Sequence, residues 1–353
     1  MKNIREIMEE TKEIVEQKKG KEYQVIYHKE DFDGLCSAAI IAQYFKDQGI
    51  SIGKIEFSGF SWEDKEYPEF LETKETYLVD LTFDKEKMLE IKERARDFIW
   101  IDHHKKKYQD LYKEEPRFKH FLGTRRDDLS ACEITFFEFL SDPSDYDSVY
   151  DISPELLEKY EIVFLLGRQD VWDLSNKLIP WHTIKKFQYG LRRFIDPLKK
   201  SSIMLLREII FDFSKLKRKA YIKRAIEVGT DILSYQENIF KNDRENVLKT
   251  VLLLDGKKFN VAVLNSSHKG SMVFGDYSKS KDVLFNFRYL PAKNMYTLSF
   301  YSEKDGVDMS GLAKWLGGGG HPGASGALIT PERFNKVFGD IFKKKPIEIN
   351  IKK

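Results

Sequence analysis

The chain has 353 residues, 41% of them hydrophobic and 33% charged, and its formal net charge is +2. This length predicts two domains, or one large one, with ample material for a core. The small net charge excludes strong overall attraction to nucleic acid, although it says nothing of local patches. The two cysteines, Cys36 and Cys132, argue against a disulfide framework and against a cysteine-rich zinc site.

No stretch of the sequence approaches the ~18 consecutive apolar residues of a membrane-spanning helix. Residues 1–21 form a charged helical pattern without the apolar segment of a signal peptide. We therefore expect a cytoplasmic protein with no membrane association.

Three apolar runs in the N-terminal half end in acids or histidines. The first, at 25–27, is followed by four residues that suit a ligand-bearing turn: His28, Asp31, Asp33 and Gly34. We expect Gly34 to allow a tight turn, and the small residues of a predicted helix at 35–45 to let that helix pack closely on a sheet.

The second run, at 77–79, ends in Asp80, and the third, at 98–101, ends in Asp102, His103 and His104. A strand at 52–57 and a helix at 84–95 complete an alternation of strands and helices, which predicts a mainly parallel sheet. Ligands of such sheets gather beyond the carboxyl ends of the strands. We therefore expect these acids and histidines to lie together.

Two further helices are predicted at 130–140 and 154–166, and Asp170 follows the second as a fourth contributor to the cluster. Nearby Asp173 is equally compatible with a supporting role and with a surface position. Residues 185–224 contain thirteen Lys or Arg and three acids, in an amphipathic helical pattern that continues to about residue 249. This basic segment is compatible with a solvated helix face and with attraction of phosphate groups.

The C-terminal part predicts a second, smaller α/β domain. Its predicted elements are a hairpin of 251–254 and 259–264 around Asp255-Gly256, strands at 283–287 and 297–301, and a helix at 308–316. The run from Gly317 to Gly326 is too rich in glycine for a packed element, and we expect its backbone N–H groups to hold a phosphate.

Carboxylates and imidazoles without cysteine suit Mn²⁺, with Mg²⁺ as the harder alternative, and suit Zn²⁺ less well. So many converging acids would repel one another unless cations neutralise them. One ion cannot use them all, so the sequence predicts a site for two metal ions, of the kind that assists phosphoryl displacement.

These residues resemble the motifs of the DHH phosphoesterases. The segment 28–34 is similar to the first motif of that family, Asp80 to the second, Asp102-His103-His104 to the signature and Asp170 to the fourth. Residues 317–326 resemble the glycine-rich His motif of the DHH-associated C-terminal domain. The resemblance covers about residues 20–345 and implies a catalytic domain at 20–195, a helical connector at 196–248, a substrate-binding domain at 249–345 and an active site between the two domains.

The resemblance also implies the role of each site residue. It makes metal ligands of six residues: His28, Asp31, Asp33, Asp80, His103 and Asp170. Asp80 would bridge two Mn²⁺ ions, Asp102 would orient a neighbouring imidazole, and His104 would contact the scissile phosphate. The residues expected to bind the substrate phosphate are Gly318, Gly319, Gly320, His321 and Arg288.

The predicted function is metal-assisted hydrolysis of short oligonucleotides or dinucleotides, as in the nano-RNase members of the family. The alternatives are a RecJ-like single-strand 5′–3′ exonuclease, a phosphatase acting on 3′-phosphoadenosine 5′-phosphate and a nucleotide sensor without catalytic activity. The choice between RNA, DNA and cyclic dinucleotides stays open, as does the choice between a monomer and a homodimer.

Overall fold

The structure is a computed structural model that describes residues 20–62, 64–141, 152–171, 173, 178–268, 270–304 and 306–351. The predicted absence of a signal peptide therefore concerns residues that lie mostly outside the described part. The chain forms two compact units, Met1–Ile232 and Leu233–Lys353. None of the helices in the described ranges is both long enough and apolar enough to cross a membrane.

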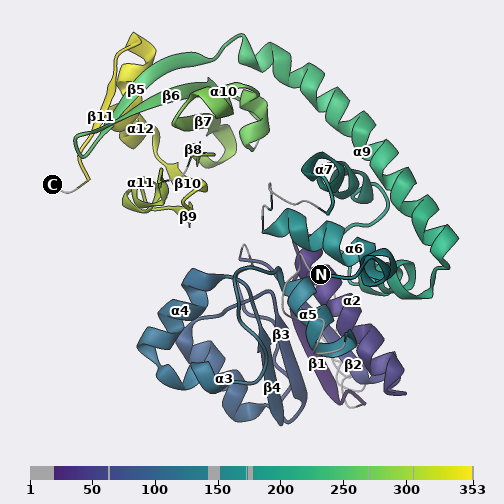
Figure 1. The fold of residues 1–353 in the computed structure, drawn as a ribbon. Helices are drawn as coiled ribbons and strands as arrows, with labels where there is room; N and C mark the ends of the chain where they lie inside the picture. Colours follow the sequence, from purple (N-terminus) through teal and green to yellow (C-terminus); the bar gives the residue numbers. More distant parts are fainter. Residues whose placement is uncertain are drawn as a thin grey trace, which may run out of the picture. The chain divides into compact units, whose positions relative to one another are not determined.

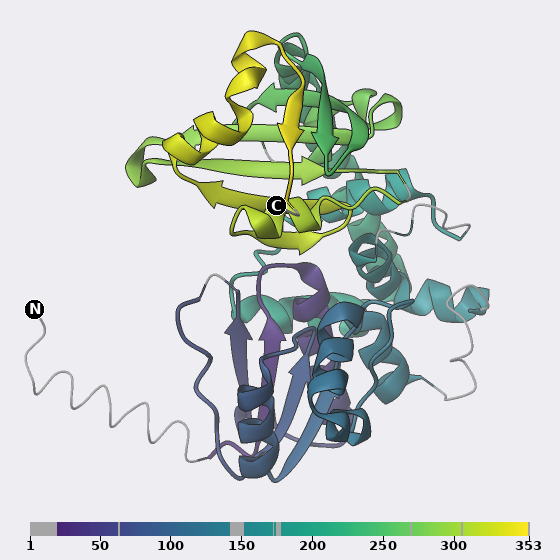
Figure 2. The ribbon, with the colours of Figure 1, turned by 90° about the vertical axis from the view of Figure 1, so that its left-hand side faces the viewer.

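The first unit is built on a four-stranded sheet in the order β2-β1-β3-β4 (Figure 1). Its strands are β1 (Tyr23–His28), β2 (Ile55–Phe60), β3 (Glu75–Val79) and β4 (Asp97–Ile101). All three pairings are parallel, and Figure 2 shows the four strands side by side. The predicted parallel sheet is confirmed, so the carboxyl ends of its strands share one edge.

Helices cover both faces of this sheet because side chains alternate along each strand. Val25 and Tyr27 of β1 belong to a large core that also takes in α2 (Phe32–Asp47), α5 (Ala131–Leu140) and α6 (Pro154–Asp170). Ile26 points to the other face and packs in a smaller core with α3 (Lys85–Arg94) and α4 (Lys105–Glu114).

The remaining helices of the first unit are α7 (Trp181–Leu191), α8 (Ser201–Arg207) and α9 (Lys215–Arg244), the last of which continues into the second unit. Ile203 and Leu206 of α8 belong to the large core. The N-terminal part of the predicted connector at 196–248 is thus packed into the first unit, and the boundary between the units lies within α9.

Helices α7 and α9 approach each other closely at glycines. A Cβ on Gly190 of α7 would lie 1.7 Å from the carbonyl oxygen of Ala225 of α9.

The second unit is a seven-stranded mixed sheet in the order β11-β5-β6-β7-β8-β10-β9. Its elements are β5 (Leu248–Leu254), β6 (Lys257–Asn265), α10 (Tyr277–Ser280), β7 (Val283–Leu290), β8 (Met295–Tyr301), α11 (Ser310–Trp315), β9 (Gly319–His321), β10 (Ala324–Ile329), α12 (Pro331–Phe338) and β11 (Ile347–Ile349). Val261 and Val263 of β6 pack on one face with α11 and α12, and Ala262 packs on the other with Phe240 of α9.

The structure confirms the predicted hairpin and corrects two other expectations. Asp255 and Gly256 connect β5 to β6 with φ angles of 49° and 80°, the left-handed region that a two-residue hairpin turn requires. The strand predicted at 52–57 begins only at Ile55, because residues 52–54 form a 3₁₀ turn. The glycine-rich segment is a packed hairpin, since β9 pairs with β10.

Candidate metal centre

The carboxyl ends of β1, β3 and β4 supply five of the residues singled out by the sequence. His28 is the last residue of β1, Asp80 follows β3, and Asp102, His103 and His104 follow β4. The three strands are neighbours in the sheet, so these side chains meet at one edge.

Asp31 and Asp33 come from the start of α2, and each is fixed by backbone N–H groups. The Asp31 carboxylate caps α2 by accepting hydrogen bonds from the N–H groups of Asp33 and Gly34, both at 3.1 Å. The Asp33 carboxylate accepts from the N–H groups of Ala131 and Cys132, both at 2.8 Å, at the N-terminus of α5. Both acids are therefore held by the positive ends of helices.

Gly34 is required for a different reason from the one that the sequence suggests. It lies within α2, and a Cβ at this position would lie 2.2 Å from the carbonyl oxygen of His28. Its role is thus to let the start of α2 approach the end of β1, which brings Asp31 within 2.8 Å of His28 Nδ1.

Asp80 lies at the centre of the cluster. Its φ of 58° is in the left-handed region, which Asp and Asn adopt more readily than most other residues. Its side chain is buried, and neither carboxylate oxygen has a hydrogen-bond partner in the part of the chain that the structure describes. Oδ2 lies 3.6 Å from His28 Nδ1, and Oδ1 lies 3.3 Å from His103 Nε2.

Asp80 forms one group of possible ligands with Asp102, His103 and His104, and two further groups lie around it. His28 and Asp31 form a group with it, with one ligand atom of each within 4.8 Å of the others. Asp33, His103 and Asp170 form a second such group, in which His103 Nε2 lies 3.0 Å from an oxygen of Asp170 and 3.6 Å from one of Asp33. The structure thus brings together all six residues predicted as metal ligands.

The electrostatics of this cluster fit divalent cations. Burial raises the pKa of Asp31 and of Asp33, and the Asp80 carboxylate raises both further. Burial opposes protonation of His103, but Asp170 and Asp80 outweigh it and raise the pKa of the imidazole well above its usual value. The buried carboxylates repel one another, and within the described residues Asp80 Oδ1 and Oδ2, His28 Nε2 and His103 Nε2 form no hydrogen bond. These atoms form a donor set suited to Mn²⁺ or Mg²⁺.

Asp102 is fully buried and orients His104. One of its oxygens lies 2.7 Å from His104 Nδ1 and accepts hydrogen bonds from the backbone N–H groups of His103 and His104. The other accepts from the Thr82 hydroxyl. The structure thus pairs Asp102 with His104, whereas the sequence identified only a neighbouring imidazole.

A buried ion-pair network beside the cluster was missed by the sequence analysis. Arg168 of α6 donates to Glu133 of α5, with Nε 2.7 Å from Oε1, and also to Asp173 at 3.3 Å. Asp173 is thus a buried partner of Arg168, which decides between its two predicted positions. The network joins the helix that carries Asp170 to the helix whose N-terminus holds Asp33. Glu133, which stands within the apolar pattern at 130–140, was the signal that could have predicted a buried charge, although not its partner.

The predicted phosphate-binding residues all lie in the second unit. A Cβ on Gly318 would lie 2.0 Å from the carbonyl oxygen of Gly326, and one on Gly320 would lie 2.6 Å from that of Ala324. These glycines are therefore needed for close packing, whereas Gly319 has open space around it. His321 ends β9, and Arg288 is a half-buried residue of β7. Their contact with a substrate stays a prediction.

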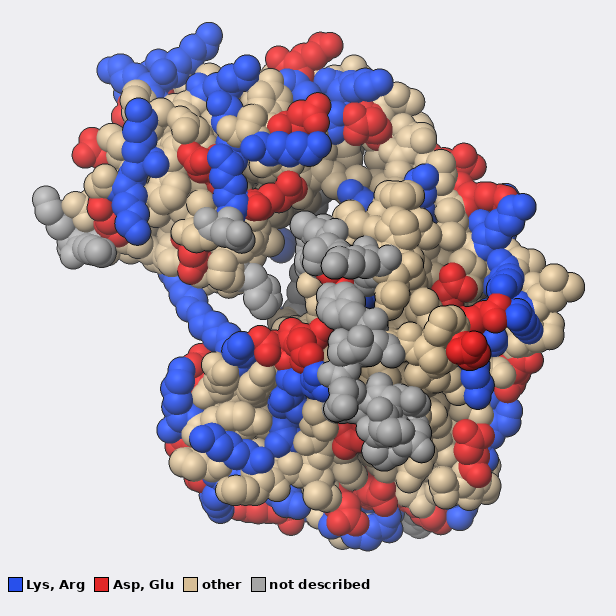
Figure 3. Space-filling view, in the orientation of Figure 1, with Lys and Arg blue, Asp and Glu red and all other residues tan. Residues whose placement is uncertain are grey.

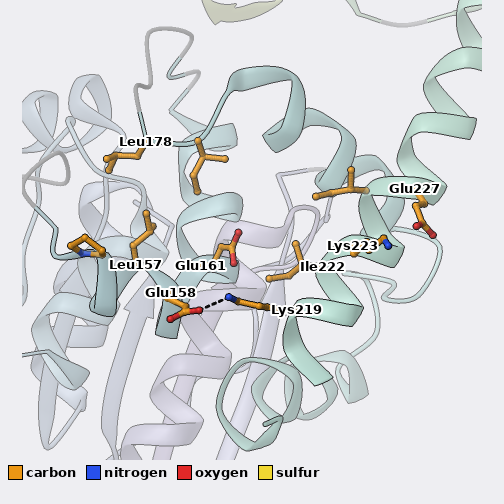
Figure 4. A pocket seen from close by; sticks show the side chains of 11 residues that line it. Leu157, Glu158, Glu161, Leu178, Lys219, Ile222, Lys223 and Glu227 are labelled. Atoms are coloured by element: carbon orange, nitrogen blue, oxygen red, sulfur yellow. Dashed lines mark ion pairs between the residues drawn. The ribbon is translucent and has the colours of Figure 1, made fainter. Parts of the chain in front are cut away.

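The first unit also has a cavity of about 670 Å³, lined by residues of α6, α9 and the segment before α7 (Figure 4). Its walls are apolar side chains such as Leu157 and Ile222, with Glu158 paired to Lys219 at one side. None of the residues predicted for the site lines it.

Comparison with known proteins agrees with this geometry. Residues 23–161 match the model of the DHH family, N-terminal domain, a range that contains every predicted ligand except Asp170. The prediction of a DHH-family domain is thereby confirmed for this segment: residues 23–161 of the first unit form a DHH-family N-terminal domain, which agrees with the predicted class of metal-dependent phosphoesterases.

One curated relative is the uncharacterized protein R106 of Acanthamoeba polyphaga mimivirus, 24% identical over 330 residues that span 87% of this chain and 67% of that protein. Among solved structures, the pGpG-specific phosphodiesterase PggH of Vibrio cholerae is similar over 91% of this chain and 98% of that chain, with a TM-score of 0.53 and 13% identity. RecJ of Thermus thermophilus in complex with Mn²⁺ matches 94% of this chain and 54% of that chain, with a TM-score of 0.46 and 13% identity. The likeness to PggH shows a shared fold.

Proposed function

We propose that this protein is a phosphodiesterase that hydrolyses short oligonucleotides or dinucleotides with two Mn²⁺ ions, or Mg²⁺ in their place. The observation that supports it most is the position of Asp80. Its two carboxylate oxygens have no hydrogen-bond partner among the described residues, and they lie near His28 on one side and His103 on the other. A carboxylate in this position is suited to bridge two ions.

Each ion has its own set of ligands in this proposal. His28, Asp31 and Asp80 would hold one ion, and Asp33, Asp80, His103 and Asp170 would hold the other. Two such ions would supply an activated water and would neutralise charge on the oxygens of the phosphoryl group.

His104 and Asp102 are the residues through which the chain itself would act on the phosphate. The Asp102 carboxylate fixes the ring of His104 and favours its protonated form, since it raises the pKa that burial lowers. A protonated imidazole held in this way can donate a hydrogen bond to a phosphoryl oxygen and stabilise the charge that develops there.

The basic segment gives little support to tracking of a long single strand. Within 185–224, Lys215 and Lys219 pair with Glu158, and Arg207 pairs with Asp212. Figure 3 shows Lys and Arg interspersed with Asp and Glu over the face in view. We therefore favour a short substrate, a choice that the shared fold with a pGpG-specific phosphodiesterase also supports.

The proposal includes the predicted phosphate contacts of 318–321 and Arg288. It also includes a cytoplasmic location and a homodimer.

A substrate panel tests the proposal. It consists of RNAs and DNAs of two to five nucleotides, long single strands, cyclic dinucleotides and 3′-phosphoadenosine 5′-phosphate, each incubated with Mn²⁺. We expect the highest kcat/KM on the two- to five-nucleotide substrates. Processive degradation of long strands would favour the exonuclease, release of phosphate from 3′-phosphoadenosine 5′-phosphate would favour the phosphatase, and binding without turnover would favour the sensor.

Asp80→Asn is the sharpest variant for the metal site. Asn has the same shape as Asp and also tolerates a positive φ, whereas Ala would add backbone strain to the loss of the carboxylate. We expect loss of at least about 1,000-fold in kcat, because bound metal ions supply several kcal/mol of transition-state stabilisation. The exposed Asp97→Asn, at the opposite end of β4, is the matched control. Turnover of Asp80→Asn within tenfold of the original protein would contradict the two-ion assignment.

A further inference from the structure

An exposed tryptophan lies next to the metal centre. Strand β2 pairs with β1 so that Phe60 is opposite His28, and Trp62 follows two residues later at the same edge of the sheet. The indole makes edge-to-face contacts with Phe60 and Phe83, at centroid distances of 5.4 and 6.3 Å. These contacts fix the ring, yet 47% of the residue is exposed.

A lysine of α4, the helix that follows β4, reaches this ring. Lys107 lies in the first turn of α4, where its N–H donates to the carbonyl of His104 at 2.9 Å. Its Nζ lies 3.5 Å from the centroid of the Trp62 ring. Within the described ranges, no carboxylate forms an ion pair with Lys107, whereas neighbouring Lys105 pairs with Asp127 at 2.7 Å.

The ammonium group of Lys107 also lies within electrostatic reach of the metal centre. Its half-buried position lowers its pKa, and the carboxylates of Asp102 and Asp80 act in the opposite direction. A cation between an aromatic ring and a metal-binding cluster is well placed for an anion, since the ring holds the side chain without neutralising its charge.

We propose that Trp62 and Lys107 form a nucleotide subsite of the first unit, in which the indole stacks on a base and the ammonium contacts the phosphate attached to that nucleotide. Aromatic side chains bind bases in this way with little dependence on base identity. The inference rests on the proposed function and narrows it: the substrate is a nucleoside phosphodiester, because pyrophosphate and polyphosphate have no base to occupy the exposed part of the ring.

The experiment compares a 5′-phosphorylated dinucleotide with two analogues, each of which lacks one of the two bases. The variants are Trp62→Ala, Trp62→Phe and Lys107→Gln, with Lys106→Gln as the charge control and Tyr235→Ala as the control for an exposed aromatic residue. KM and kcat are measured with Mn²⁺. Calorimetric binding of a hydrolysis-resistant phosphorothioate dinucleotide gives a readout independent of turnover.

For Trp62→Ala we expect KM and Kd on the intact dinucleotide to rise about tenfold with kcat changed less than about twofold, as loss of one stacking contact predicts. The rise in KM and Kd should be absent with the analogue that lacks the base stacked on Trp62. Trp62→Phe should retain most of the affinity of the unmodified protein. Lys107→Gln should raise KM on all three substrates and weaken its salt dependence, while both controls leave KM unchanged.

Three results would overturn the inference. They are unchanged KM and Kd in Trp62→Ala, equal losses of affinity in Trp62→Ala on all three substrates, or a rise in KM in Lys107→Gln no larger than that in Lys106→Gln. If Trp62→Ala does not fold, the inference is tested by the KM and Kd of Trp62→Phe and Lys107→Gln. Failure of the proposed function is a separate result, because the unmodified protein would then not cleave the dinucleotide, while calorimetry would still show whether Trp62 binds it. Absence of dinucleotide binding by the unmodified protein would overturn both.

Discussion

Asp102 is a buried carboxylate that orients a neighbouring side chain, the imidazole of His104. It makes no contact with solvent, and its hydrogen-bond partners include two backbone N–H groups, the Thr82 hydroxyl and His104 Nδ1. Such a carboxylate acts on the reaction only through the imidazole that it orients.

We predict that Asp102→Asn lowers kcat between about 10- and 100-fold, the range for groups that support the residues of a metal site, and changes KM less than twofold. The amide retains the shape of the carboxylate but loses the charge that stabilises protonated His104. Steady-state kinetics on the dinucleotide gives both constants. Thr82→Val is the control, because it removes a hydrogen bond to Asp102 without touching His104, and it should cost less. A rise in KM with unchanged kcat would show that Asp102 serves substrate binding instead.

The residues of the candidate metal centre could be predicted from the sequence, but the partners that fix them could not. His28, Asp80 and His103 each follow an apolar run, and the alternation of strands and helices places the ends of such runs together. The pairing of Glu133 with Arg168 depends on the packing of α5 against α6, which no local pattern encodes. The same holds for Trp62 and Lys107, which come from different parts of the chain.

At the scale of elements, the glycine hairpin of β9 and β10 shows where composition misleads. Gly318 and Gly320 lie where any side chain would collide with neighbouring backbone, so the density of glycine reflects close packing around α11 and β10. Open space surrounds Gly319, which can therefore report on substrate contact without disturbing the fold.

We predict that Gly318→Ala lowers the melting temperature, because overpacking of this kind costs about 1–3 kcal/mol. Gly319→Ala should leave the melting temperature unchanged and, if this backbone holds a substrate phosphate, raise KM on the dinucleotide several-fold. Circular dichroism and kinetics on the two variants separate the two roles. Unchanged KM in Gly319→Ala would remove the hairpin from the proposed substrate site.

Other elements were predicted well where hydrophobic periodicity and turn chemistry agree. The helices at 130–140 and 154–166 and the hairpin at Asp255-Gly256 are of this kind. The predicted start of the strand at residue 52 was wrong because Ser51 caps a 3₁₀ turn, with its hydroxyl accepting from the Gly53 N–H. A local side-chain hydrogen bond thus overrode an apolar residue at position 52.

At the scale of the whole molecule, the two units have separate cores, and all six predicted metal ligands lie in the first. The large core around α2 and α5 contains residues of the first unit only, and the core around α12 contains residues of the second only. Metal binding should therefore stabilise one unit of the molecule and not the other.

We predict that Mn²⁺ raises the unfolding temperature of the first unit selectively. An ion present at 100 times its Kd contributes about 2.7 kcal/mol. For a unit of this size that corresponds to a rise of roughly 5–10 °C. Differential scanning calorimetry with and without Mn²⁺, and after addition of EDTA, measures the shift without any substrate. Asp80→Asn should abolish most of it, because the substitution removes the carboxylate that is proposed to bind both ions. A shift that persists in Asp80→Asn, or that moves the transition of the second unit equally, would show that the ion binds elsewhere.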